Sequence, residues 1–148
     1  MGISYDVFVN AFLSKITEYE LLKLNENDRT DLVDSYLRTS SSSFNKFCKY
    51  DLSDRDDEKR MFNADIDDSD LDDIIDIVSE GMLIQWMKPY VYKQENLENM
   101  LNTTDYSGYS PAELLHRISE AYTNVKKDYR NMVVNYTYDK GDLTTLSL

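Results

Sequence analysis

The sequence predicts an all-α fold, a bundle of about four to five helices with a long acidic loop and an extended C-terminal tail. Glycine and proline are scarce, with four and two residues in 148, and this favours helices over strands joined by tight turns. Apolar residues recur at helical spacing in several segments. We expect one helical domain over residues 1–138, with an acidic connection at about 49–68, and a tail over 139–148.

The N-terminal half contains two predicted helices. The first spans about 4–16 and begins at Ser4, a residue type that caps helix N-termini. The second spans about 27–48, and the serine tract 40–43 predicts a kink or fray because serine lowers helix propensity. Between them, a capping box predicts a short helical turn over 17–24. The apolar stripes are Phe8, Phe12 and Ile16 in the first helix, and Leu32, Val33, Tyr36, Leu37, Ser40, Phe44 and Phe47 in the second.

The C-terminal half contains three predicted helices. Apolar residues cover most of the circumference of the helix predicted over 69–88, which indicates a central helix packed on several sides. We expect Pro89 to end this helix or to open the next, a shorter one over 90–101. The run 110–113 (SPAE) supplies a capping serine, a proline at the first helical position and a glutamate at the third, and so predicts a last helix over 110–136. We expect the run 139–142 (DKGD) to stop it.

Negative charge is concentrated in one part of the chain. Between Asp51 and Asp76 there are twelve acidic residues, opposed only by Arg55, Lys59 and Arg60. The difference, twelve minus three, gives nine of the twelve net negative charges. A surface that binds nucleic acid phosphates needs the opposite sign. This stretch is therefore either a spacer kept soluble by self-repulsion or a wall that must not adhere to an anionic partner.

The residues that carry catalysis or bind metals are scarce. The only histidine, His116, and the only cysteine, Cys48, are far apart in sequence, which argues against a zinc site or a nucleophile–base pair. The run 65–71 has the alternating acids of a calcium loop, but Asp70 replaces the glycine at the sixth position and Asp76 the glutamate at the twelfth. No apolar run approaches a membrane span. We expect no catalytic residues, no metal, no cofactor and no membrane partner.

The last predicted helix differs from the acidic stretch in charge. Four cationic residues give it a slight positive excess, and they are candidate contacts between subunits: Arg117, Lys126, Lys127 and Arg130. Two copies could bring the acidic region of one against this helix of the next, and head-to-tail contacts of that kind generate rings when the rotation closes. The alternative is that the acidic stretch is only a solvated loop.

Several short runs along the chain can be compared with known proteins. They are 15–22 (KITEYELL), 36–38 (YLR), Cys48 with 51–58 (DLSDRDDE), 62–63 (FN), Trp86 with Pro89, 101–103 (LNT), 109–112 (YSPA), and 136–138 (YTY) with 141–143 (GDL). Together these runs, spread from about Tyr5 to Leu143, resemble the small head-to-tail connector proteins of tailed bacteriophages, also called adaptor or head-completion proteins.

This resemblance implies a helical adaptor without enzymatic activity or cofactor. It implies a ring of about twelve copies in the virion neck, made from chains synthesised in the host cytoplasm. The ring would join the portal protein to the next neck component, the stopper or tail-completion protein, while DNA passes without specific binding.

The resemblance also implies roles for particular residues. In such adaptors the C-terminal segment reaches onto the portal, and the candidate portal contacts here are Tyr136, Tyr138, Leu143, Leu146 and Leu148. The middle acidic region would face the channel or the neighbouring ring, and its candidate residues are Asp54, Asp56, Asp57, Glu58, Asp67 and Asp68.

A conduit for DNA works best when its wall repels phosphate, and the acidic stretch carries the charge for this. A second function class also fits a net charge of −12, namely an acidic DNA mimic that inhibits a nucleic-acid-binding enzyme. A mimic would be expected to spread its carboxylates over an elongated face, whereas these crowd into one connection and the start of one helix.

Overall fold

The computed structural model describes residues 2–16, 30–92 and 111–140. About three quarters of these residues are helical, in four helices accompanied by a small three-stranded sheet, so the expectation of a mostly helical fold is confirmed. In chain order the elements are β1 (Ile3–Ser4), α1 (Tyr5–Ile16), α2 (Thr30–Phe44), β2 (Arg55–Asp56), β3 (Met61–Phe62), α3 (Asp68–Tyr92) and α5 (Pro111–Lys140).

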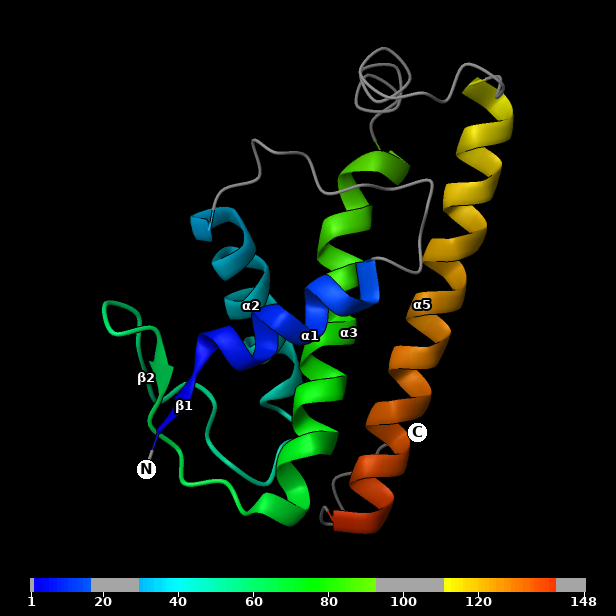
Figure 1. The fold of residues 1–148 in the computed structure, drawn as a ribbon. Helices are drawn as coiled ribbons and strands as arrows, with labels where there is room; N and C mark the ends of the chain where they lie inside the picture. The colour runs from blue at the N-terminus through cyan, green and yellow to red at the C-terminus, as the bar shows by residue number, and fades with distance from the viewer. Residues whose placement is uncertain (1, 17–29, 93–110, 141–148) are drawn as a thin grey trace.

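Helix α3 is the centre of the fold, as its apolar circumference predicts. It packs against α1, α2 and α5, and Figure 1 shows it between α5 on one side and the α1–α2 pair on the other. Trp86 of α3 is buried, and its ring lies edge-on to that of Phe12 of α1, with centroids 6.1 Å apart. The other large buried side chains of α3 are Ile74, Ile77, Val78, Met82, Leu83 and Met87.

Three helices approach one another closely at Gly81 of α3. A Cβ atom there would lie 2.1 Å from Oγ of Ser40 in α2 and 3.3 Å from a ring carbon of Tyr129 in α5. The Ser40 hydroxyl donates a hydrogen bond to the carbonyl of Val78 at 2.7 Å, so it is satisfied within the helix contact. The absence of a side chain at Gly81 therefore lets α2 and α3 pack at this distance.

The start of α1 and the start of α5 agree with the local sequence signals. The backbone N–H of Asp6 donates to Oγ of Ser4 at 3.2 Å, so Ser4 caps α1. The predicted apolar stripe of α1 is buried. Helix α5 begins at Pro111, the residue predicted for the first helical position.

Helix α2 departs from its predicted course. It ends at Phe44 instead of near Cys48, and it continues without interruption through 40–43, so the expected fray in the serine tract is wrong. Leu32 and Phe47, which were expected in the buried stripe, are each 40% exposed. The tract stays helical because Ser40 and Ser41 are buried, Ser40 against α3, and this packing outweighs the weak helix propensity of serine.

Pro89 lies inside α3, so the expectation that it ends the helix is wrong. Proline removes one backbone donor from the helix. The buried side chains of Trp86 and Met87 lie in the preceding turn, and those of Tyr90 and Val91 pack partly against the core in the turn that follows. Packing on both sides of the proline therefore holds the helix to Tyr92.

Helix α5 continues past the end predicted at about 136 to Lys140, which lies inside the run 139–142 that was expected to stop it. Residues 139 and 140 are thus helical and do not belong to a tail. The helical turn predicted over 17–24, residues 93–101 of the predicted short helix, and the rest of the tail, 141–148, lie outside the described residues.

The acidic connection contains structure that its sequence did not predict. Strands β2 and β3 pair antiparallel within it, and β1 pairs antiparallel with β3, which gives the order β1-β3-β2. Phe62 lies opposite both Ile3 and Arg55 in this register. Gly2 precedes β1, and a Cβ there would lie 2.6 Å from the Phe62 carbonyl oxygen, so glycine permits the close approach.

Candidate functional site

The candidate site is the acidic hairpin, which we define as residues 54–63: β2, the turn 57–60 and β3. Apolar side chains within and beside it hold it to the helices, and Leu52, Phe62 and Ile66 are all buried. The Phe62 ring lies 5.0 Å from that of Tyr5 and 5.2 Å from that of Phe8, measured between centroids. Met61, which precedes Phe62 in β3, is half-buried.

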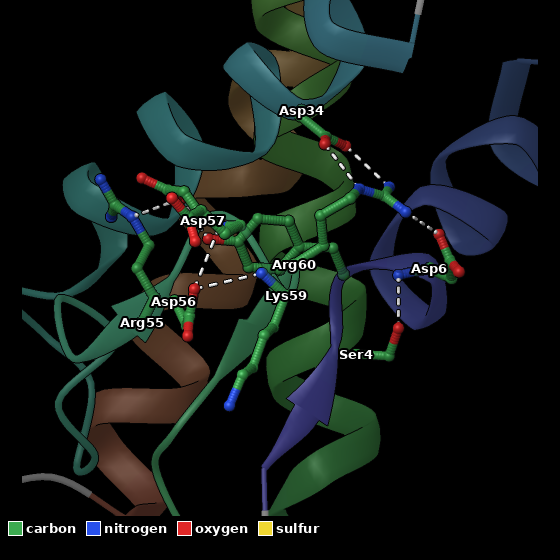
Figure 2. Close-up of polar contacts among 10 residues, drawn as sticks. Ser4, Asp6, Asp34, Arg55, Asp56, Asp57, Lys59 and Arg60 are labelled. Carbon is green, nitrogen blue, oxygen red and sulfur yellow. Dashed lines mark hydrogen bonds and ion pairs between the residues drawn. The ribbon is translucent and has the colours of Figure 1, made fainter.

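Arg60 ties the acidic hairpin to two helices (Figure 2). Its Nε donates to Oδ2 of Asp34 at 2.7 Å and its Nη2 to Oδ1 of the same residue at 2.9 Å, while Nη1 donates to Asp6 at 2.8 Å. Asp34 belongs to α2 and is buried, whereas Asp6 belongs to α1 and is exposed. The backbone of Arg60 adds a further link, because its carbonyl accepts the N–H of Tyr5 at 2.9 Å.

The backbone of Arg60 is in the left-handed region, with φ at 55°. For a residue other than glycine, this backbone conformation costs about 1–2 kcal/mol relative to the right-handed one. The ion pairs of its guanidinium group offset this cost. The residue is therefore held by interactions made at both its backbone and its side chain.

The carboxylates of the acidic hairpin take part in its local structure. The carboxylate of Asp56 accepts the backbone N–H groups of Glu58 and Lys59 at 3.0 and 3.1 Å, which fixes the turn (Figure 2). Asp54 accepts a hydrogen bond from the side-chain amide of Asn63 at 3.0 Å. These contacts hold the hairpin in a defined conformation.

Tyr5 and Asp57 form the remaining polar link between the acidic hairpin and α1. The Tyr5 hydroxyl donates to the Asp57 carboxylate at 2.5 Å, and Arg55 lies 3.3 Å from the same oxygen. The hydrogen bond from Tyr5 is the main cause that lowers the pKa of Asp57. Burial, followed by that hydrogen bond, raises the pKa of Tyr5. The carboxylate and the protonated phenol thus stabilise each other.

Most of the predicted acidic surface residues are exposed. Asp54, Asp57 and Glu58 are exposed on the acidic hairpin, whereas Asp56 is half-buried. Asp67 and Asp68 are exposed at the start of α3, at the lower end of the molecule in Figure 1. The six residues therefore occupy two regions, the hairpin and the first turn of α3.

Asp70 differs from its acidic neighbours because it is buried. It accepts the Tyr50 hydroxyl at 2.5 Å, and Nζ of Lys49 lies 3.8 Å away. This hydrogen bond is the main cause that raises the pKa of Tyr50. Asp70 thus links the segment that follows α2 to the start of α3. Its role is to stabilise the fold.

The candidate subunit contacts all lie on α5, and all four are exposed. Helix α5 packs on α3, which leaves a wide part of its circumference open. Nζ of Lys126 lies over the Tyr122 ring, 4.7 Å from its centroid. Lys127 and Arg130 lie three residues apart on the exposed side.

The candidate portal contacts differ in their exposure. Tyr136 is buried, its ring packs against that of Phe44, and its hydroxyl accepts the backbone N–H of Lys49 at 3.0 Å. It serves the core and offers little surface to a partner. Tyr138 is 70% exposed on the last turn of α5. The other three candidates, Leu143, Leu146 and Leu148, lie outside the described residues.

Sequence reasoning missed the residues that hold the acidic hairpin in place. Arg60 counts in the sequence only as one cation among many acids, and Tyr5 as one of twelve tyrosines. One signal was available, because Arg60 directly precedes the apolar pair Met61-Phe62, where a chain turns toward its core. Nothing in the sequence identifies Asp34 as the partner.

The described residues contain no other arrangement that points to chemistry. Within 2–16, 30–92 and 111–140, no three His, Cys, Asp or Glu side chains converge in a way that could hold a metal ion. None of the described helices has the length and apolar character needed to cross a bilayer.

Comparison with known proteins adds no relative. No protein-family model matches the chain, and no curated protein or solved structure is similar enough to count as a match.

Proposed function

We propose that this chain is a structural protein of a tailed-bacteriophage virion, a head-to-tail adaptor. About twelve copies form a ring in the neck, between the portal protein and the next neck component, the stopper. The chain is made in the host cytoplasm, has no enzymatic activity and lets DNA pass without specific binding.

The observation that carries this proposal is the firm attachment of the acidic hairpin. The buried Phe62 ring, which packs on Tyr5 and Phe8 of α1, and the Arg60 ion pairs fix the hairpin to α1 and α2, so its carboxylates are displayed at defined positions. A soluble spacer needs no such attachment. A surface that repels a phosphate backbone needs its charges at fixed positions, because the repulsion acts over only about 8–10 Å at ordinary salt.

Two further observations support an adaptor. Helix α5 offers a long exposed side, and Tyr138 is an exposed aromatic residue near its end, both of which suit contacts with other proteins. The runs that resemble phage connector proteins also extend over most of the chain.

The test is binding to the portal protein encoded in the same genome. The purified chain and the portal are mixed and examined by negative-stain electron microscopy, and we expect a ring of added density on one end of the portal. A variant that lacks residues 141–148 should keep its helical circular dichroism and lose portal binding. Absence of added density with the full chain would refute the adaptor function, whereas retained binding by the truncated chain would remove only those residues from the contact.

The DNA-mimic alternative gives a different result. A mimic stays a monomer or dimer, ignores the portal and competes with DNA for a basic nuclease or repressor. Fluorescence anisotropy of labelled DNA with such an enzyme, in the presence of increasing amounts of the chain, separates the two functions. An adaptor leaves the DNA-bound fraction unchanged at physiological salt.

A further inference from the structure

Two surfaces of unlike charge lie on opposite sides of the molecule. The acidic hairpin projects on the side of α1 and α2, and α5 lies on the other side of α3 (Figure 1). We define the outer α5 face as Lys127, Arg130, Asn131 and Val134, which are exposed and spaced as one face of a helix. Val134 is 40% exposed, so this face combines two cations with an apolar residue.

The outer α5 face and the acidic hairpin each have charges that no other described residue neutralises. Within 2–16, 30–92 and 111–140, Lys127 and Arg130 form no ion pair, and neither does Glu58 in the hairpin turn. Lys126, by contrast, is already placed over Tyr122. The Arg60 guanidinium pairs with Asp34 and Asp6 of the helices, so the exposed Lys59 is the cation of the turn 57–60 that is left to offset Asp57 and Glu58.

The net charge of −12 limits how two copies can meet. A two-fold contact of the outer α5 face with itself brings cation against cation, and one of hairpin with hairpin brings anion against anion. Only a contact of unlike surfaces, outer α5 face to acidic hairpin, brings opposite charges together. Such a contact is heterologous and propagates from copy to copy until the rotation closes a ring.

We propose that the outer α5 face of one copy binds the acidic hairpin of the next copy, head to tail. This inference rests on the ring proposed above and specifies its subunit contact. Exposed ion pairs contribute little individually and are screened by salt, so the contact weakens as ionic strength rises. Closure of the ring then supplies the avidity that a single contact lacks.

The test uses two complementary variants of the full chain. Lys127→Glu/Arg130→Glu disables the outer α5 face. Asp54→Asn/Glu58→Gln disables the acidic hairpin without creating a cation that could attract the glutamates of the first variant, and asparagine at position 54 keeps an oxygen to accept the Asn63 hydrogen bond. The masses of the assemblies are measured by native mass spectrometry and by sedimentation at low salt over a range of concentrations, after Trp86 fluorescence has shown that each variant is folded.

We expect the wild-type chain to form oligomers that dissociate with added salt. Each variant alone should be monomeric, with at least about a tenfold rise in the concentration needed to associate. An equimolar mixture of the two variants should stop at a dimer, because each variant retains one intact surface and only one productive contact remains. A symmetric contact between like surfaces, outer α5 face with outer α5 face or hairpin with hairpin, cannot give this result.

A matched control has the same net charge as the variant Lys127→Glu/Arg130→Glu. Arg117→Glu/Lys126→Glu changes the net charge as much as Lys127→Glu/Arg130→Glu does, but at positions outside the outer α5 face, and it should associate like the wild type. The contact is overturned if the control loses association equally, if either disabled variant still oligomerises, or if the wild-type chain stays monomeric at millimolar concentration and low salt. Normal rings on the portal in any of these cases would leave the adaptor function standing.

Discussion

Arg60 and Asp34 form a bidentate ion pair that joins the acidic hairpin to α2, with N–O distances of 2.7 and 2.9 Å. Asp34 is only 6% exposed, so removal of the cation leaves a buried carboxylate without compensation. We expect Arg60→Met to lower the free energy of unfolding by about 3 kcal/mol. Urea denaturation followed by Trp86 fluorescence measures this. Asp6→Asn, which breaks only the exposed pair, should cost less than about 1 kcal/mol, and an equal cost for both would contradict this account.

The left-handed backbone of Arg60 gives a second prediction, independent of its ion pairs. Arg60→Gly and Arg60→Ala both remove the guanidinium group, but only glycine adopts φ near 55° without steric cost. We expect the glycine variant to be more stable than the alanine variant by about 1 kcal/mol, measured by urea denaturation. Alanine has the lower unfolded-state entropy, so in an ordinary conformation the order would be reversed. That reversed order would show that the backbone carries no strain.

The burial of Phe62 predicts that it controls the attachment of the acidic hairpin. Phe62→Ala should lower the free energy of unfolding by about 3–4 kcal/mol, because it leaves a cavity beside Tyr5 and Phe8. It should also speed tryptic cleavage at Arg55, because local detachment exposes the hairpin backbone. Met61→Ala, at the half-buried neighbouring position, is the control and should cost about 1 kcal/mol or less. Cleavage at unchanged rate in Phe62→Ala would mean that the ion pairs alone hold the hairpin.

The approach of α2 and α3 at Gly81 predicts a strong effect of one methyl group. In Gly81→Ala the new Cβ forces the Ser40 hydroxyl away from Val78, and the Ser40 Cβ at 3.1 Å leaves little room to adjust. Overpacking costs about 1–3 kcal/mol, and the better helix propensity of alanine offsets about 1 kcal/mol of that. We expect a net loss near 1–2 kcal/mol by thermal or urea unfolding. Ser40→Ala in the same chain should recover part of it, and strictly additive costs would argue against the contact.

The link between Tyr5 and Asp57 predicts a defined pH dependence. The pKa of Asp57 is lowered, so the stability it confers is present above 3.8 and is lost as pH falls through the lowered folded value. The pKa of Tyr5 is raised, so its contribution is present below 10.0 and is lost as pH rises toward the raised folded value. Tyr5→Phe should therefore cost about 1 kcal/mol at neutral pH and less at either extreme. The measurement is the difference in unfolding free energy between wild type and variant across pH, and a constant difference would refute the link.

The sequence predicted those parts of the fold whose signals are local. Ser4 and Pro111 mark helix starts through the capping requirements of the backbone, and the apolar circumference of α3 identifies it as the central helix. Local rules failed where tertiary contacts decide. The Ser40–Ser43 tract and Pro89 both stay helical because packing around α3 outweighs their weak propensities.

The strands and the hairpin attachment were beyond sequence reasoning for a different reason. Strands of two residues are too short to show alternation, and β1 pairs with residues far along the chain. The charge pattern showed where acidic residues concentrate along the chain. It did not indicate that Arg60 turns away from its acidic neighbours to reach Asp34, because the choice among many carboxylates depends on how the helices are placed.

The pairing of β1 with β3 also has a consequence for synthesis on the ribosome. Ile3 is synthesised well before its partner Phe62, so β1 stays unpaired until α1, α2 and the intervening chain have emerged. Contacts so distant in sequence form slowly, since a long loop must close first. A nascent chain stalled before Phe62 would carry β1 without its pairing partner. In that form, chaperone binding or aggregation competes with folding.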